Sequence, residues 1–365
     1  MGGARGTLEI NPVVCCERLI RLADPKVLIV RRDNIGDLVC TTPMFTALRR
    51  CYPNCTLAAL VNTYNKDVLE THPALNKVFA YEKAKHRGKD TSLMSNYLGR
   101  WRLIRELRKW RFDYAILAGP GYQKHSVRHV RLAGAAKVIG FSDSGSARGL
   151  DIAVPYRDGS QLHEVEDVFR LLQPLHVVGP PPATLISATK AALEAARKSI
   201  GRLRGTGPLV ALHISARKPS QRWAATKFSL LGRLLSTIFG CRIILLWAPG
   251  DQSNPKHPGD DDKAILVSTS MGEVNHLAYP TDSVGALMGV LGLCDVFIGA
   301  DGGAMHLAAG LGKPVIALFG DSAPSRWRPW SVPSEVLHPA SRDVSDISVD
   351  EVLQAYKRIN GIVGH

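Results

Sequence analysis

Short apolar runs, many of them β-branched, recur along the chain, and longer segments with helical spacing separate them. This alternation predicts parallel β-sheets covered by helices. In the first half, the expected strands are residues 27–30, 56–61, 77–80, 113–117 and 137–140. In the second half, they are residues 208–213, 242–247, 264–267, 295–298 and 314–318.

A proline-rich segment separates the two sets of strands. Residues 176–185 read HVVGPPPATL, and three consecutive prolines cannot continue a helix or an inner strand. We therefore expect a linker at residues 179–185. The predicted fold class is α/β, with two doubly wound, Rossmann-like lobes at residues 1–178 and 186–345, each long enough to bury its own core.

The last segment, residues 346–360, has the pattern of an amphipathic helix. Ser348 and Glu351 have the spacing of a capping box. One face is apolar and consists of Val349, Val352, Leu353, Tyr356 and Ile359. We expect this helix to pack back onto the N-terminal lobe.

The composition is that of a soluble globular protein, with 45% hydrophobic and 21% charged residues. No apolar run reaches the roughly 20 residues that span a bilayer, and no secretory signal is evident, which favours a cytoplasmic protein. The seven cysteines form no Cys-x-x-Cys pair, so reduced thiols are expected rather than zinc or disulfides. The net charge of +14 indicates a polyanionic partner: nucleic acid, anionic lipid or a phosphorylated glycan.

Three loops that follow predicted strands carry unusual chemistry, and ligands of parallel sheets bind at such loops. In the first, residues 31–50, the acid Asp37 stands beside Gly36, with Arg31 close by. Asp37 either caps the following helix or accepts a proton in a reaction. The residues alone favour the cap.

A second loop with unusual chemistry follows the strand expected at 295–298. Gly302 and Gly303 follow Asp301, so the backbone N–H groups of the next helix could approach a phosphate closely. His306 falls in the first turn and could donate to the same oxyanion. The alternative is an Asp-Gly-Gly turn that caps a buried helix, with His306 in the core. The residues alone leave both interpretations open.

The third loop, residues 212–223, places Lys218 and Arg222 near Ser215. It is either a solvated basic loop or an anion site. Asp251, after the next strand, could accept hydrogen bonds from ribose hydroxyls. The acidic run at residues 260–262 is expected to be solvated rather than a metal site. Neither G-x-G-x-x-G after a first strand nor a P-loop motif is present.

Two motifs, NIGDLVCTTPMFTALRRCYP at 34–53 and GADGGAMHLAAGLGKPVIALFG at 299–320, occur in this order. Together with the weaker RLAGAAKVIGF (131–141) and APSRWRPW (323–330), they resemble glycosyltransferase family 9, the ADP-heptose:lipopolysaccharide heptosyltransferases. The resemblance extends from about Val27 to Pro329. It implies a GT-B fold, in which the acceptor binds the first lobe and the nucleotide sugar binds the second. It also implies inverting sugar transfer without metal or cofactor, with ADP-heptose as co-substrate.

The resemblance assigns roles to residues of the three loops. It makes Asp37 the general base, and Asp301, Gly302, Gly303 and His306 the residues that hold the diphosphate and sugar. Two departures concern the nucleotide sugar. Gly302 stands where the family usually has serine or threonine, and Gln221 stands where it has lysine. Lys218 or Arg222 is expected to substitute for that lysine, with Ser215 and Asp251 as further contacts.

On the acceptor side, we expect Arg31, Lys124 and Arg128 to bind the anionic inner core of lipopolysaccharide. Lys124, Arg128 and Arg131 share one helical face, although such a face is ordinarily solvated. The positive charge also favours peripheral contact with the anionic inner membrane surface.

Two alternatives are a GT-B enzyme that uses another nucleotide sugar and a non-catalytic nucleic-acid-binding protein. Against the second, aromatic residues do not alternate with the basic ones as base-stacking platforms would, so no nucleic-acid partner is expected.

Overall fold

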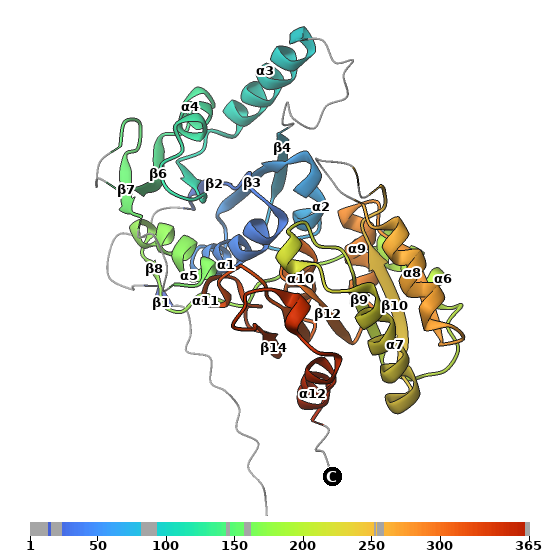
Figure 1. Cartoon of the computed structure of the whole chain (residues 1–365). Coiled ribbons are helices and arrows are strands. Elements are labelled where there is room, and N and C mark those ends of the chain that lie inside the picture. The colour runs from blue at the N-terminus through green and yellow to red at the C-terminus, as the bar shows by residue number, and fades with distance from the viewer. Residues whose placement is uncertain are drawn as a thin grey trace, which may run out of the picture.

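Two six-stranded parallel sheets form the two lobes of the protein (Figure 1). The computed structural model describes residues 14–15, 24–81, 93–143, 147–156, 162–251, 253 and 259–361. The N-terminal sheet has the order β4-β3-β2-β5-β6-β7, and the C-terminal sheet has the order β11-β10-β9-β12-β13-β14. The N-terminal strands are β2 (Lys26–Val30), β3 (Thr56–Asn62), β4 (Lys77–Tyr81), β5 (Tyr114–Leu117), β6 (Lys137–Ser142) and β7 (Ile152–Pro155). The C-terminal strands are β9 (Leu209–His213), β10 (Arg242–Trp247), β11 (His276–Pro280), β12 (Val296–Ala300), β13 (Val315–Leu318) and β14 (Ser334–Leu337).

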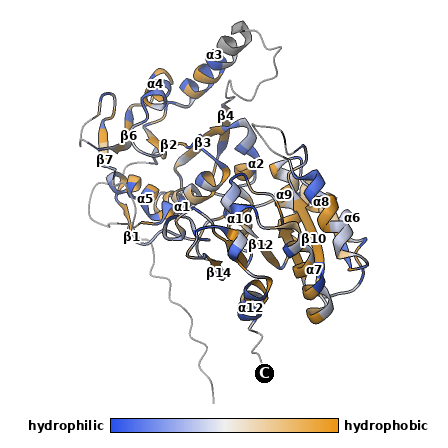
Figure 2. Cartoon of the chain, in the orientation of Figure 1, coloured by the Kyte–Doolittle hydropathy of each residue, from blue (hydrophilic) through white to orange (hydrophobic). Residues whose placement is uncertain are grey.

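Helices surround both sheets, while the strands between them are largely apolar, as Figure 2 shows for β10. The helical segments before the linker are α1 (Ile35–Cys51), η1 (Thr63–Asn65), α2 (Lys66–Leu69), α3 (Leu93–Trp110), α4 (Lys124–Leu132), α5 (Glu164–Phe169) and η3 (Arg170–Leu175). Those after it are α6 (Lys190–Ile200), η4 (Pro219–Gln221), α7 (Ala225–Phe239), α8 (Asp261–Met271), α9 (Val284–Leu291), α10 (Gly303–Gly310), α11 (Pro324–Trp327), η5 (Val344–Asp346) and α12 (Val349–Ile359). Two short strands, β1 (Val14–Cys15) and β8 (Val177–Val178), pair antiparallel.

Nine of the ten expected strands coincide with observed strands, and the one at 264–267 is wrong. That apolar run lies within α8. Ala264 and Val267 are buried at helical spacing, whereas Ile265 and Leu266 are 65% and 52% exposed. The adjacent acids at the start of α8 favour a helix because they interact well with its positive end. Five strands were not predicted: β1, β7, β8, β11 and β14.

The linker passes between the lobes without regular structure from Gly179 to Thr189. Its later part is fixed on both sides. The N–H of Leu185 donates to Oγ1 of Thr42 in α1 (3.0 Å), and the N–H of Ile186 donates to the carbonyl oxygen of Gly310 in α10 (2.9 Å).

The C-terminal helix α12 packs on its own lobe, so the expectation that it crosses to the N-terminal lobe is wrong. Its buried residues Val352 and Tyr356 belong to an apolar cluster with β9, β10 and α7. The hydroxyl of Tyr356 lies 3.1 Å from Sγ of Cys241, and Arg358 pairs with Glu335 of β14 (2.8 Å). The apolar face of α12 completes the cover of the C-terminal sheet.

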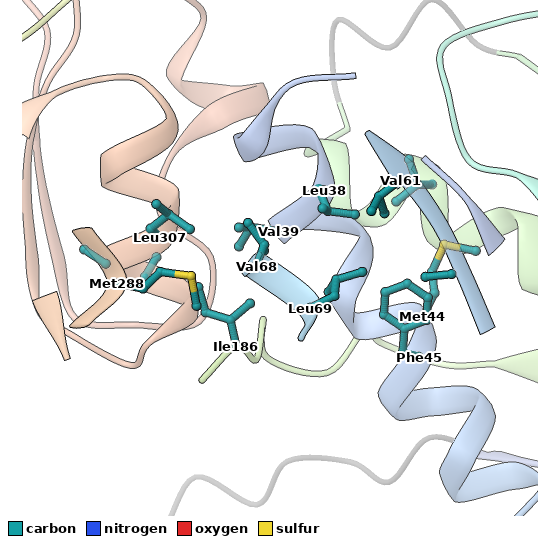
Figure 3. Packing of buried hydrophobic residues seen from close by; sticks show 14 of the residues in the cluster. Leu38, Val39, Met44, Phe45, Val61, Val68, Leu69, Ile186, Met288 and Leu307 are labelled. Atoms are coloured by element: carbon teal, nitrogen blue, oxygen red, sulfur yellow. The ribbon is translucent and has the colours of Figure 1, made fainter. Parts of the chain in front are cut away.

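The two lobes meet where α1 packs against α10, and one apolar cluster continues across this contact (Figure 3). Glycines allow the close approach. A Cβ on Gly36 would lie 2.5 Å from Cδ2 of His306, and one on Gly303 would lie 3.2 Å from Cβ of Ile35. The start of α1 therefore lies directly against the start of α10.

Four cysteines, Cys40, Cys55, Cys241 and Cys294, are free and buried. Cys51, by contrast, is disulfide-bonded, so the expectation of reduced thiols throughout is wrong at this position. Within the described part of the chain, no helix is both long enough and apolar enough to cross a membrane.

Candidate active site

Asp37 lies in the first turn of α1, and both of its carboxylate oxygens are engaged. Oδ2 accepts from the backbone N–H of Asn34 (3.1 Å) and from the Asn34 amide (3.0 Å), which closes the helix start. Oδ1 accepts from Nη2 of Arg31 (2.6 Å). The side chain keeps 13% of its surface exposed. Asp37 thus caps the helix while its carboxylate is fixed in orientation and open on one side.

Arg31 is buried, with 1% exposure, at the centre of a charged network. Its guanidinium contacts Asp37, Glu164 (2.8 Å) and Asp33 (3.1 Å), and it donates to the carbonyl oxygen of Ala118. Burial alone would lower the pKa of Arg31, but these three carboxylates raise it above its ordinary value. Because its guanidinium is buried among protein groups, Arg31 holds the Asp37 carboxylate in place. A contact between Arg31 and the acceptor stays a prediction.

Glu164 connects this network to the other lobe. Its Oε1 accepts from Arg31, and its Oε2 accepts from Nη2 of Arg326 in α11 (2.5 Å). Burial raises the pKa of Glu164, while the two arginines act against this. We take Glu164 as ionised, because both of its oxygens accept charge-assisted bonds from arginines. A chain of alternating charges therefore runs from Asp37 through Arg31 and Glu164 to Arg326.

His163 makes a second contact between the lobes beside Glu164. Its Nδ1 accepts from the N–H of Val165 (3.1 Å), and its Nε2 lies 2.8 Å from the carbonyl oxygen of Arg328. A carbonyl can only accept, so Nε2 carries the proton. Burial lowers the pKa of His163 to about 4, which fits this neutral form.

His306 lies at the start of α10, facing α1. Its ring is close to Gly36, and its Nδ1 lies 3.8 Å from Sγ of Cys40. Burial lowers the pKa of His306, although Asp301 and Asp37 act to raise it. Burial raises the pKa of the Cys40 thiol, which therefore keeps its proton and can donate it toward Nδ1 of His306. That arrangement leaves Nε2–H as the donor that His306 offers to a ligand.

The start of α10 has no side-chain cap. Gly302 occupies the N-cap position and makes no side-chain hydrogen bond. Asp301 points elsewhere, because its Oδ2 accepts from Nε2 of Gln221 (3.1 Å), which also donates to Ser322 (2.9 Å). The N–H groups of the first turn have no partners within the helix, and they carry the positive end of its dipole. This helix start is suited to an anion.

Among the other residues expected to bind the nucleotide sugar, some side chains are exposed and others already bond to protein groups. Lys218 is exposed at the start of η4. Arg222 pairs with the buried Asp260, so its guanidinium is already engaged. Ser215 accepts from the N–H of Ala248 (2.9 Å) and ties the loop after β9 to the end of β10.

Asp251 follows β10, is exposed, and its Oδ1 accepts from the N–H of Ser253 (2.7 Å). Its position at the carboxyl end of the sheet is the one expected for a ribose contact. Lys124 and Arg128 are both exposed on α4. Among the described residues, no group of three or more His, Cys, Asp or Glu is arranged to hold a metal ion.

Comparison with known proteins identifies the family. The model of glycosyltransferase family 9 (heptosyltransferase) matches residues 100–354. The chain belongs to glycosyltransferase family 9. Lipopolysaccharide heptosyltransferase 3 of Escherichia coli is 25% identical over 310 residues, which cover 81% of this chain and 84% of the relative. A putative glycosyltransferase of Haemophilus influenzae is 24% identical over 324 residues, with 83% and 86% covered.

Solved structures of the family share the fold. The family 9 enzyme of Veillonella parvula has a TM-score of 0.79 at 19% identity and covers 93% of this chain and 98% of its own. The E. coli ADP-heptose heptosyltransferase II has a TM-score of 0.73 at 17% identity, covering 92% and 98%. The expected GT-B fold of two facing Rossmann-like lobes is confirmed.

Several residues of this family 9 site were not predicted: Cys40, His163, Glu164, Gln221, Arg326 and Trp327. The rings of Trp327 and His306 pack nearly perpendicular to each other, with centroids 6.0 Å apart. Residues 323–330 did stand out as a motif, but no local signal pairs Arg326 with a glutamate 162 positions earlier.

Proposed function

We propose that the chain is an inverting heptosyltransferase that moves a heptose from ADP-heptose to an inner-core lipopolysaccharide acceptor. Its family and the names of its relatives support this, since two of them are lipopolysaccharide heptosyltransferases 3 and 2. A similar solved structure, with a TM-score of 0.69 and 18% identity, contains ADP-2-deoxy-2-fluoro heptose.

One observation carries the proposal: the fixed carboxylate of Asp37 and the uncapped start of α10 lie on either side of the contact between Gly36 and His306. In the proposed step, the acceptor hydroxyl gives its proton to Asp37 and its oxygen attacks the anomeric carbon. The bond from that carbon to the diphosphate breaks, and the electron pair leaves with ADP. Attack from the opposite side inverts the configuration.

The departing diphosphate meets the N–H groups of α10 and Nε2–H of His306. These dipoles are held in place before the reaction, so they stabilise the growing negative charge without reorganisation. In this proposal no metal takes part, because the helix start and neighbouring cations such as Lys218 supply the positive charge. The nucleotide sugar is the co-substrate, and Ser215 and Asp251 are proposed to contact its nucleoside end.

The Glu164–Arg326 pair would position the base. Arg326 belongs to the C-terminal lobe and is linked to Asp37 through Glu164 and Arg31. Docking of the lobes therefore completes the charge balance around Asp37, which would link nucleotide-sugar binding to activation of the acceptor.

The positive charge of the chain supports an anionic acceptor and a position at the membrane surface. Lys124 and Arg128 extend from the exposed side of α4 and are proposed to contact anionic groups of the lipopolysaccharide core. The net charge of +14 suits a peripheral position on the cytoplasmic face of the inner membrane. No nucleic-acid partner is part of this proposal.

The test is transfer from ADP-heptose to a heptose-deficient lipopolysaccharide by Asp37→Asn. We expect transfer to fall by at least about 10³-fold, as for loss of a general base, while calorimetric ADP affinity stays within about twofold. Asp113→Asn, at the amino ends of the N-terminal strands, is the control and should transfer normally. Full transfer by Asp37→Asn would leave Asp37 as a helix cap alone.

A second candidate is a glycosyltransferase for another nucleotide sugar, favoured by Gly302 and Gln221 in place of the usual hydroxyl and lysine. Calorimetry with ADP-heptose beside UDP- and GDP-linked sugars distinguishes the two. We expect measurable heat only with ADP-heptose.

A further inference from the structure

A second cluster of positive charge lies on the N-terminal lobe, around the ring of Tyr81 at the end of β4. The guanidinium carbons of Arg32 and Arg100 lie 5.1 and 5.7 Å from the ring centroid. Nη2 of Arg100 also donates to the Tyr81 hydroxyl (2.7 Å). The ring of His129 meets Tyr81 edge-on at 5.7 Å.

Neither arginine of this cluster forms an ion pair with a carboxylate in the described part of the chain. Nη2 of Arg32 donates to the Ser126 hydroxyl (2.8 Å), which is neutral. The neighbouring Arg31, in contrast, contacts three carboxylates. Burial lowers the pKa of Arg32, and the positive charge of Arg100 lowers it further. Tyr81 and Asp33 act in the opposite direction. Two like charges held close together repel each other, and because no described carboxylate pairs with either guanidinium, an anionic ligand would relieve this repulsion.

The cluster lies at the edge of the sheet where an acceptor is expected. Arg32 lies in the loop between β2 and α1, five residues before Asp37. Ser126 lies in the first turn of α4, and Tyr81 is the last residue of β4. All three positions are therefore at the carboxyl ends of parallel strands, which form the ligand-binding edge of such sheets.

We propose that Arg32 and Arg100, joined by the Tyr81 hydroxyl, form a subsite for a phosphate monoester or carboxylate group. The Tyr81 oxygen accepts from Arg100, which leaves its own O–H as a donor to an oxyanion. Guanidinium groups bind such oxyanions through charge-assisted hydrogen bonds. That this anion belongs to the sugar acceptor rests on the proposed function, whereas anion binding itself does not.

The test is a binding titration with two sugar acids, glucose 6-phosphate and glucuronate, in the presence of saturating ADP. ADP is expected to occupy the start of α10, so the sugar acid reports on the N-terminal lobe. We expect saturable binding of at least one sugar acid, and the two arms show whether phosphate or carboxylate is preferred. Arg32→Gln and Arg100→Gln should each weaken it about tenfold or more, the effect of losing one charge-assisted hydrogen bond.

Arg102→Gln is the matched control, because it removes the same charge from the same helix. Residues 100 and 102 point about 200° apart around α3, so Arg102 should not reach Tyr81. Its affinity should stay within twofold of the wild-type value, and Arg32→Lys should retain part of the binding. Equal losses in Arg102→Gln and Arg32→Gln, or no saturable binding of either sugar acid to the wild-type chain, would overturn the subsite.

The same variants keep this inference separate from the proposed function. If Asp37→Asn transfers sugar normally but Arg32→Gln loses sugar-acid binding, the base assignment fails and the subsite stands. If Asp37→Asn is inactive and Arg32→Gln binds like the wild type, the subsite fails alone. Unchanged melting temperatures of the arginine variants would show that their folds are intact.

Discussion

The two helices that meet between the lobes begin in opposite ways. The start of α1 is closed, because Asp37 bonds Asn34 and is itself held by Arg31. The start of α10 is open, because Gly302 has no side chain and Asp301 is held by Gln221. Both starts have the same backbone chemistry and the same positive dipole. The difference in side chains makes one of them suited to present a carboxylate and the other to receive an anion.

The largest expected effect comes from opening the closed side with Arg31→Gln. Asp33, Asp37 and the buried Glu164 would lose their shared cation. Loss of one partner of a buried ion pair costs about 3–5 kcal/mol of stability. Urea unfolding measures this cost. Arg358→Gln removes an exposed ion pair with Glu335 and should cost at most about 1 kcal/mol. Similar small costs for both variants would mean that Arg31 does not hold the closed start together.

The two starts face each other only while the lobes stay docked, and His163 makes this docking sensitive to acid. Its pKa is about 4 in the folded protein and about 6.5 when exposed. Between these values the unfolded chain binds a proton that the folded chain does not, so stability rises with pH across this window.

The difference of about 2.5 between the two pKa values of His163 corresponds to about 3 kcal/mol of stability. This contribution is fully present above pH 6.5 and is lost as the pH falls through 4. His163→Gln should remove that part of the acid-dependent loss in urea titrations at several pH values. An unchanged slope would show that His163 is not the titrating group. His72→Gln is a useful comparison, since burial also lowers the pKa of His72 to about 4 but this residue lies away from the α11 contact.

A smaller effect tests the close approach of the two starts. In Gly36→Ala, the new methyl group would lie 2.5 Å from the ring of His306, so the ring or the lobe must shift. We expect a loss of about 1–3 kcal/mol from overpacking and a several-fold weaker ADP affinity. Gly99→Ala in α3 is the matched control, because nothing lies within 4 Å of its Cβ, and it should stabilise by about 0.5–1 kcal/mol. Wild-type ADP affinity in Gly36→Ala would separate His306 from the nucleotide site.

The smallest effects come from exchanging the caps. Asn34→Ala should cost about 1 kcal/mol and leave ADP affinity unchanged, because the proposed diphosphate site is at α10 and not at α1. Gly302→Ser places a hydroxyl in open space, since the nearest atom to a Cβ there is 4.0 Å away. It should change stability by only a few tenths of a kcal/mol, while one new hydrogen bond to a phosphate oxygen raises ADP affinity about threefold to tenfold. The reverse pattern of affinities would exchange the roles of the two helices.

How much of the fold and the site could be predicted depends on how far apart in the sequence the interacting residues lie. The alternation of apolar runs predicted nine strands, because strand and helix periodicity are local properties. The strand predicted at 264–267 was wrong, because packing against the sheet decides which side of α8 is buried. At the site, Asp37, Asp301 and His306 follow strands and belong to motifs, so their neighbourhood could be predicted. Arg31 was expected to contact the acceptor, but Glu164, which holds it, lies 133 positions away.

The most direct test of the difference between the two helix starts is an ADP titration followed by the amide NMR signals of both. If the open start receives the diphosphate, the N–H signals of Gly303, Ala304 and Met305 shift on saturation, while those of Ile35 and Gly36 shift much less. If ADP binds while the α10 amides stay unchanged, or while the α1 amides shift as much, the account is contradicted.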